Sequence, residues 1–180
     1  MKRVFLLGAT IALVACGSAD GGSDTDGDGT VSQAEMDAAI ANADEVKPEP
    51  GKYRVNMEVT EVDLPGAPDQ IISMLRSNMN REYDMCITPE EAENGFRDAL
   101  SQQDGCEVRR FRIDGGDIDM AMVCDQAGEG MEFAMTGEVT PTTSDLDMTM
   151  NGNAPGMGEM TMTMNYTQER VGDCDGTEEV

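Results

Sequence analysis

Apolar and polar residues alternate along several stretches of the chain, and this pattern predicts a fold rich in β-strands. From Lys52 to Leu64, most apolar residues occupy every second position, which is typical of a strand with one buried face. Similar alternation recurs toward the C-terminus, and runs of turn residues separate the segments. The predicted strands are 52–64, 106–113, 117–124, 131–139, 144–150 and 159–171.

Two further segments have helical character. Apolar residues recur at helical spacing from Asp69 to Arg81, which predicts an amphipathic helix. A second helix is predicted to start after Thr88, because Pro89 suits a first helical position and Glu91 completes a capping box with Thr88. Phe96 and Leu100 would face the core. The predicted fold class is α+β, an antiparallel β-meander of about six strands with two helices.

The residues around Gly115–Gly116 predict a β-hairpin with a two-residue turn. Counting outward from the turn, the apolar positions match until Arg109–Arg110, where their parity slips by one residue. One β-bulge there restores the match and brings Cys106 opposite Cys124. The other expected pairs are Ile113 with Ile118, Phe111 with Met120, and Val108 with Met122.

Four cysteines remain besides Cys16, and an even number in an exported protein predicts two disulfides. Three pairings are possible. The hairpin favours Cys106 with Cys124, which leaves Cys86 with Cys174. The chain contains no CxxC motif, so a redox enzyme is disfavoured.

The N-terminus has the features of an export signal. Lys2 and Arg3 precede an apolar run, Val4 to Val14, that is too short to span a bilayer. The run ends in Leu13-Val14-Ala15-Cys16, which resembles a bacterial lipobox. This resemblance implies cleavage after a signal peptide of residues 1–15 and lipidation of Cys16. Gly17 in place of Asp implies an outer-membrane protein facing the periplasm. The alternative is an ordinary signal peptide with a cysteine nearby by chance.

Residues 24–35 resemble the twelve-residue calcium loop of an EF-hand. Gly29 occupies position six, where the loop turns sharply. The segment before the loop cannot form an entering helix, but residues 32–43 predict an exiting helix capped by Ser32. The expected calcium affinity is weak, with a dissociation constant of about 10⁻⁴ to 10⁻³ M. A disordered Asp/Gly-rich linker is the alternative. The predicted ligands are Asp24, Asp26, Asp28, Thr30 (backbone carbonyl), Ser32 (through water) and Glu35.

Composition further limits the possible functions. The formal net charge of −24 disfavours nucleic acid and favours divalent cations or basic partners. The chain has no His, which excludes His-based catalytic triads and makes zinc or haem sites unfavourable. No pair of carboxylates stands out as an acid–base pair. We therefore expect a monomeric, non-enzymatic protein.

Methionine is abundant, with 16 Met against 4 Phe and 3 Tyr. Many of these residues recur at strand spacing and would share one face of the predicted sheet. The simplest interpretation is that methionine fills the core. Two alternatives are a carrier or scavenger of an apolar ligand such as a lipid, and a copper(I) site built from thioethers.

The main domain resembles domain-of-unknown-function family 3617, a group of proteobacterial envelope proteins. The resemblance rests on Gly51-Lys-Tyr-Arg-Val, on Cys86-Ile-Thr-Pro-Glu90, on the Cys106–Cys124 hairpin and on Arg170-Val-Gly-Asp-Cys174. It implies a secreted or lipid-anchored protein with four cysteines, and names no activity.

Together these features predict a periplasm-facing lipoprotein, held at the membrane by the Cys16 lipid, with one calcium loop. The predicted segments are 1–15 (signal peptide), 16–23 (tether), 24–43 (calcium loop and helix), 44–51 (linker), 52–174 (main domain) and 175–180 (acidic tail).

Overall fold

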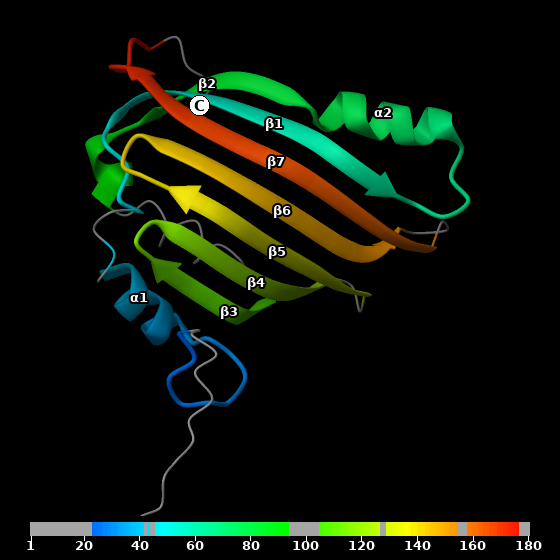
Figure 1. Cartoon of the computed structure of the whole chain (residues 1–180), viewed down its shortest axis with the longest axis horizontal. Coiled ribbons are helices and arrows are strands. Elements are labelled where there is room, and N and C mark those ends of the chain that lie inside the picture. The colour runs from blue at the N-terminus through cyan, green and yellow to red at the C-terminus, as the bar shows by residue number, and fades with distance from the viewer. Residues whose placement is uncertain are drawn as a thin grey trace, which may run out of the picture.

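The computed structural model contains one antiparallel sheet with a short helix near each of its two edges (Figure 1). It describes residues 23–41, 43, 46–93, 105–126, 129–154 and 158–176. The predicted signal peptide and Cys16 lie outside these residues. The elements are α1 (Gln33–Ala41), β1 (Gly51–Asp63), α2 (Asp69–Met79), β2 (Arg81–Ile87), β3 (Cys106–Asp114), β4 (Asp117–Gln126), β5 (Glu129–Val139), β6 (Thr143–Ala154) and β7 (Gly158–Gly172).

The described strands form a seven-stranded sheet in the order β2-β1-β7-β6-β5-β4-β3. From β3 to β7 each strand pairs with the next one in the chain, which confirms the predicted meander. The last strand, β7, then pairs with β1. This long-range pairing joins the two ends of the main domain and leaves β3 and β2 as the two edges of the sheet.

The hairpin of β3 and β4 confirms the predicted register. Its pairs run from Ile113 opposite Ile118 to Cys106 opposite Cys124, and they include the two other expected pairs. The register shifts between Val108 and Arg110, where the sequence predicts a bulge.

One face of the sheet carries most of the apolar side chains. Cross-strand partners point to the same face, and one such row runs through six strands. The row consists of Val59, Met164, Met148, Met135, Met120 and Phe111. Near one edge α2 packs against Val59 and Met162, and near the other α1 packs against Phe111 and Met120. Met120, Met122 and Met162 lie in the buried core, as the simplest interpretation predicts. Met135, Met148 and Met164 are only partly buried.

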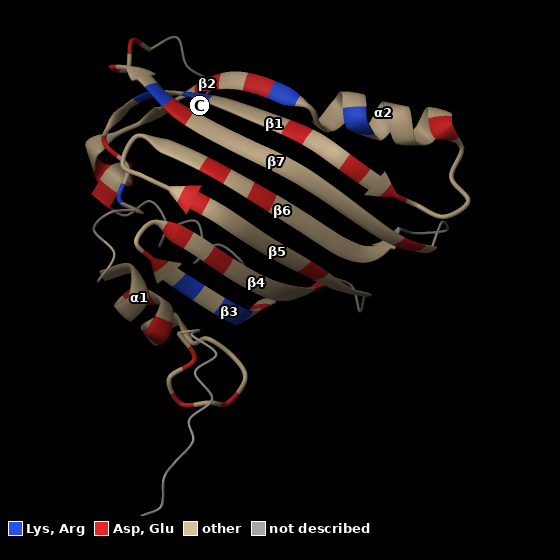
Figure 2. Cartoon of the chain, in the orientation of Figure 1, with Lys and Arg blue, Asp and Glu red and all other residues tan. Residues whose placement is uncertain are grey.

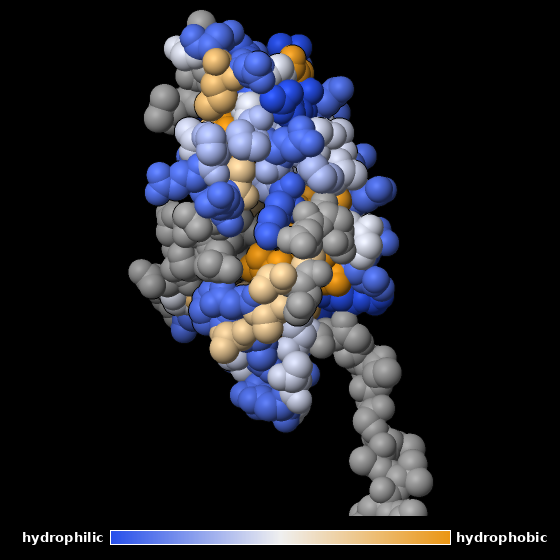
Figure 3. Space-filling view, turned by 90° about the vertical axis from the view of Figure 1, so that its left-hand side faces the viewer, coloured by the Kyte–Doolittle hydropathy of each residue, from blue (hydrophilic) through white to orange (hydrophobic). Residues whose placement is uncertain are grey.

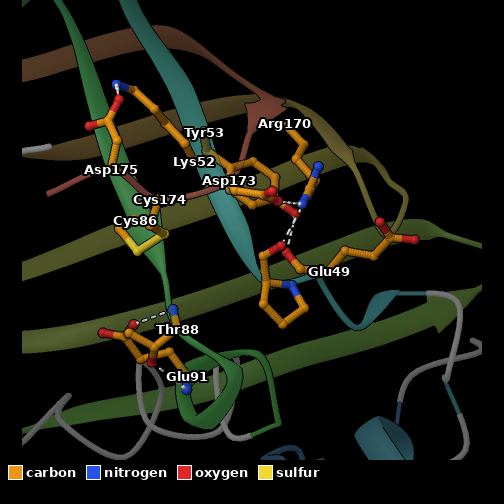
Figure 4. The surroundings of a disulfide bond; sticks show 11 residues. Glu49, Lys52, Tyr53, Cys86, Thr88, Glu91, Arg170, Asp173, Cys174 and Asp175 are labelled. Atoms are coloured by element: carbon orange, nitrogen blue, oxygen red, sulfur yellow. Dashed lines mark hydrogen bonds and ion pairs between the residues drawn. A yellow bond between two sulfur atoms is a disulfide. The ribbon is translucent and has the colours of Figure 1, made fainter. Parts of the chain in front are cut away.

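Both predicted disulfides are present. Cys106 and Cys124 join the ends of β3 and β4, with Cα atoms 3.9 Å apart. Cys86 and Cys174 join the end of β2 to the chain beyond β7, with Cα atoms 5.5 Å apart (Figure 4). Because disulfides form and persist in oxidising compartments, this pattern is consistent with an extracytoplasmic protein.

The start of β1 and the end of β7 are fastened by polar contacts around a buried tyrosine (Figure 4). Tyr53 is 1% exposed, and its hydroxyl donates to the backbone carbonyls of Glu49 and Pro141 at 2.7 and 2.9 Å. Arg170 donates from Nε to the carbonyl of Pro50 at 3.0 Å and from a terminal nitrogen to Asp173 at 2.9 Å. Tyr53, Arg170 and Asp173 all belong to the two motifs that carry the family resemblance at the ends of the domain.

Two predictions of secondary structure need correction. The helix predicted to reach Arg81 ends at Met79, and Arg81 instead begins β2, which the alternation pattern does not predict. This edge strand is largely polar and partly exposed, so it lacks a clear apolar stripe. The predicted helix after Thr88 does begin at Pro89, and Thr88 and Glu91 form the expected capping box. Phe96 and Leu100 lie outside the described residues.

The segment between the predicted calcium loop and β1 packs on the sheet. Ala43 and Val46 are 3% and 4% exposed and pack with Ile118 and Leu146. The amide of Glu49 also donates to the carbonyl of Pro141 at 2.7 Å. The predicted linker is therefore attached to the domain at these positions. Among the described residues, no helix is long and apolar enough to cross a membrane.

Candidate functional site

The predicted calcium loop brings three carboxylates together. Asp24, Asp26 and Asp28 each place a carboxylate oxygen within 4.8 Å of the other two. The last two side chains are exposed, and that of Asp24 is partly buried. Figure 2 shows the loop as an acidic segment next to α1. Within the part of the chain that the structure describes, no lysine or arginine pairs with these three carboxylates.

Backbone amides of the loop hold the first aspartate in place. Asp24 accepts from the amide of Gly27 at 2.7 Å with one oxygen, and from that of Gly29 at 3.0 Å with the other. Both glycines have a positive φ, +75° and +88°, which side-chain-bearing residues rarely adopt. The predicted sharp turn at Gly29 is therefore present, and it folds the loop around the Asp24 carboxylate.

Hydrogen bonds also hold the second half of the loop, from Asp28 to Glu35. Asp28 accepts from both the amide and the hydroxyl of Thr30, at 2.8 and 2.7 Å. Ser32 precedes the first residue of α1, where its hydroxyl accepts from the amide of Glu35 at 3.4 Å. All six predicted ligands thus lie in one continuous loop that ends in the first turn of α1.

Glu35 does not belong to the cluster of three aspartates. One of its oxygens accepts from the amide and hydroxyl of Thr25, and the other from the amide and hydroxyl of Ser32. These hydrogen bonds, that of the Thr25 hydroxyl above all, lower the pKa of Glu35 to about 2. The carboxylate therefore links the start of the loop to its end. Sequence reasoning missed Thr25, because a second position in this loop carries no ligand.

The loop is attached to the edge strand β3 at two points. The amide of Val31, at position eight, donates to the carbonyl of Val108 at 2.8 Å. The amide and hydroxyl of Ser23, just before the loop, both donate to the carbonyl of Phe111, at 2.9 and 2.7 Å. The sequence offers no signal for either contact, because the partners are far apart in the chain.

Apolar side chains extend this attachment into the core. Val31, Met36 and Ile40 are 5%, 5% and 8% exposed and pack with Phe111, which is fully buried. Met120, Met122 and Cys124 complete the same cluster. In the side view of Figure 3, apolar residues gather directly above the hydrophilic loop. The loop and its helix are therefore packed onto the main domain.

Chemically, the loop offers several hard oxygen donors on a largely exposed segment of chain. Calcium prefers six to eight such oxygens, from carboxylates, backbone carbonyls and water. Three aspartates with no basic partner among the described residues fit this requirement.

The methionine face is the second candidate site. Met135, Met148 and Met164 lie opposite one another on β5, β6 and β7, and each is partly exposed. Their thioethers offer soft, polarisable contacts.

Comparison with known proteins identifies a family but no characterised relative. A family model described as "Protein of unknown function (DUF3617)" matches residues 48–174. No curated protein and no solved structure matches the chain. The match leaves out the acidic loop and α1, and it includes all seven strands and both disulfides. Because the match covers more than half of the chain, the protein belongs to the DUF3617 family.

Proposed function

We propose that this chain is a non-enzymatic lipoprotein of the outer membrane, facing the periplasm, that binds one calcium ion in the loop from Asp24 to Glu35. The observation that carries the proposal is the convergence of Asp24, Asp26 and Asp28 within 4.8 Å, at the spacing of an EF-hand loop. The two disulfides support an extracytoplasmic site. The lipid would be carried by Cys16.

Calcium is favoured over other cations for a physical reason. The donors are oxygens only, which suits the variable coordination of calcium, whereas magnesium demands near-ideal octahedral geometry and copper and zinc favour nitrogen or sulfur. Glu35 would complete the site with both oxygens, and it would then give up hydrogen bonds from Thr25 or Ser32. That exchange is consistent with weak affinity, about 10⁻⁴ to 10⁻³ M.

The position of the loop suggests a role at the membrane surface. Asp24 lies eight residues beyond Cys16, so the loop begins within roughly 26 Å of the lipid. A bound cation would order the tether or bridge to anionic lipid head groups. The variant combining Asp24→Ala and Glu35→Ala tests this role. If membrane association and protease resistance near residue 30 in calcium match the unsubstituted protein, the membrane role is wrong.

Calorimetric titration of calcium into the chain from Gly17 to Val180 tests binding itself. Glu35→Gln is the informative variant, because Gln keeps a capping oxygen for α1 and loses the bidentate carboxylate. Glu58→Gln on β1 is the matched control, since it makes the same change on another part of the surface. We expect saturable heat that Glu35→Gln abolishes and Glu58→Gln retains. No heat at millimolar calcium would contradict the proposal.

The alternative function is that of a carrier or scavenger of an apolar ligand. The partial exposure of Met135, Met148 and Met164 across neighbouring strands favours it. Native mass spectrometry of the purified chain should then detect a co-purified lipid. Copper(I) bound by the same thioethers is a less favoured alternative, and the same spectrum would reveal it as a mass increment.

A further inference from the structure

We propose that binding of calcium is coupled to docking of the N-terminal arm, residues 23–41, on the edge strand β3. Val31 occupies position eight, and its amide donates to Val108 of β3. The loop is therefore joined to an edge strand of the sheet at this position. This inference rests on the proposed calcium function and names how that site is regulated.

The two attachment points lie on either side of the three aspartates. Ser23 lies immediately before Asp24, and Val31 lies between two predicted ligands, Thr30 and Ser32. Undocking of the arm would therefore free Ser23 and Val31, the residues on either side of the aspartates. Conversely, a cation that fixes the loop also fixes the two amides that bond to β3.

The exiting helix supplies a second connection. Glu35, the last predicted ligand, precedes Met36, whose side chain is 5% exposed in the cluster around Phe111. A cation that binds Glu35 would therefore also hold the first turn of α1, which carries Met36. Without a cation, three carboxylates within 4.8 Å repel one another and favour release of the arm. Release would uncover the backbone edge of β3 and part of its apolar face, so calcium would control how well this edge is covered.

Amide hydrogen exchange measures the coupling directly. The experiment compares the chain from Gly17 to Val180, which contains every described residue, in chelator and in 10 mM calcium. If exchange of the Val31 amide requires an opening that loses the ion, calcium slows it by the ratio of its concentration to the dissociation constant, roughly 10- to 100-fold. The amide of Val55 in β1 serves as the control and reports whether the sheet stays folded. Calcium binding with unchanged exchange at Val31 would overturn the coupling and leave the proposed function intact.

The reverse measurement follows from thermodynamic reciprocity. Met36→Ala combined with Ile40→Ala removes two anchors of the arm that lie outside the predicted ligands, so the ion-free arm is mostly undocked. The apparent calcium affinity then falls with the docked fraction, by at least about fivefold. Ile72→Ala combined with Leu75→Ala, in α2, shortens two partly buried apolar side chains of the other helix and should leave the affinity unchanged.

The outcomes separate the two proposals. Unchanged affinity in the α1 variant, with Val31 exchanging faster than in the unsubstituted chain, would overturn the coupling alone. Absence of calcium binding by the unsubstituted chain would overturn the proposed function and the coupling together.

Discussion

The Nε atom of Arg170 lies 2.6 Å from the point where a Cβ on Gly51 would stand. The carbonyl oxygen of Gly172 lies at the same distance from that point, on the other strand of the pair. The arginine passes over Gly51 to donate to the carbonyl of Pro50. Glycine at this position therefore allows the start of β1 to meet the end of β7.

We predict that Gly51→Ala destabilises the fold by about 1–3 kcal/mol, because the new methyl group must displace both the guanidinium and a backbone carbonyl. Gly130→Ala is the control, since a Cβ there meets no atom within 4 Å. Urea unfolding of both variants measures the effect. Equal stability of the two variants would show that the strand ends can separate without cost.

Tyr53→Phe tests the hydroxyl at the same junction. The side chain is 1% exposed, and its hydroxyl is bonded to the carbonyls of Glu49 and Pro141. Removing the hydroxyl takes away the hydrogen bonds to both carbonyls, although that of Pro141 still accepts from the Glu49 amide. We expect a loss of about 1–2 kcal/mol in the free energy of unfolding. Tyr83→Phe serves as the comparison, because that residue lies on the edge strand and is less buried. A cost for Tyr53→Phe no larger than that of Tyr83→Phe would contradict the argument.

How far the fold can be predicted depends on the range of the contacts. The β3–β4 hairpin is predictable to its register, because a glycine turn, apolar parity and two cysteines all lie within about twenty residues. The pairing of β1 with β7 cannot be predicted in this way, since no local sequence feature indicates that the last strand pairs with the first. Strand β2 escapes prediction because an edge strand needs no apolar stripe.

The candidate site shows the same division. The convergence of the three aspartates and the turn at Gly29 follow from a local motif whose chemistry requires that spacing. The motif does not indicate that Glu35 bonds to Thr25 and Ser32. The anchoring of Val31 on Val108 could not be predicted, because it depends on which strand ends up at the edge of the sheet. The packing of Val46 on the sheet could not be predicted for the same reason. Its flanking prolines and glycine indicate a linker, and only the folded sheet supplies its apolar partners.

The two disulfides should contribute unequally. In the chain-entropy model, the bond between Cys86 and Cys174, separated by 88 residues, contributes about 4.5 kcal/mol. The bond between Cys106 and Cys124, separated by 18 residues, contributes about 3 kcal/mol. We therefore predict that replacing the first pair by serine lowers the free energy of unfolding more than replacing the second. If the second pair proves to contribute more, the stabilisation by these disulfides does not come mainly from the lower entropy of the unfolded chain.

The stability of the fold should fall at alkaline pH. Burial, and secondarily Tyr83, raises the pKa of Tyr166 from 10.0 to about 12. Because the raised pKa favours the neutral phenol in the folded state, this stabilisation is complete below pH 10 and is lost as the pH rises toward 12. Tyr166→Phe should flatten the decline in unfolding free energy over that range. Burial also raises the pKa of Tyr53, so part of the decline should persist. An unchanged profile in Tyr166→Phe would be the contrary result.

Substitution of one loop aspartate should have opposite effects with and without calcium. In chelator, Asp26→Asn removes one of three carboxylates within 4.8 Å, so repulsion falls and the melting temperature should rise slightly, on the order of 1–2 °C. In millimolar calcium the same substitution removes a ligand, and the variant should melt below the unsubstituted chain because it gains less from binding. Asp63→Asn, at the end of β1, changes the same charge and should shift the melting temperature equally in both conditions. The decisive observation is that the shift in melting temperature changes sign between the two conditions. If Asp26 acted only through charge repulsion, the variant would melt higher in chelator and would not melt lower than the unsubstituted chain in calcium.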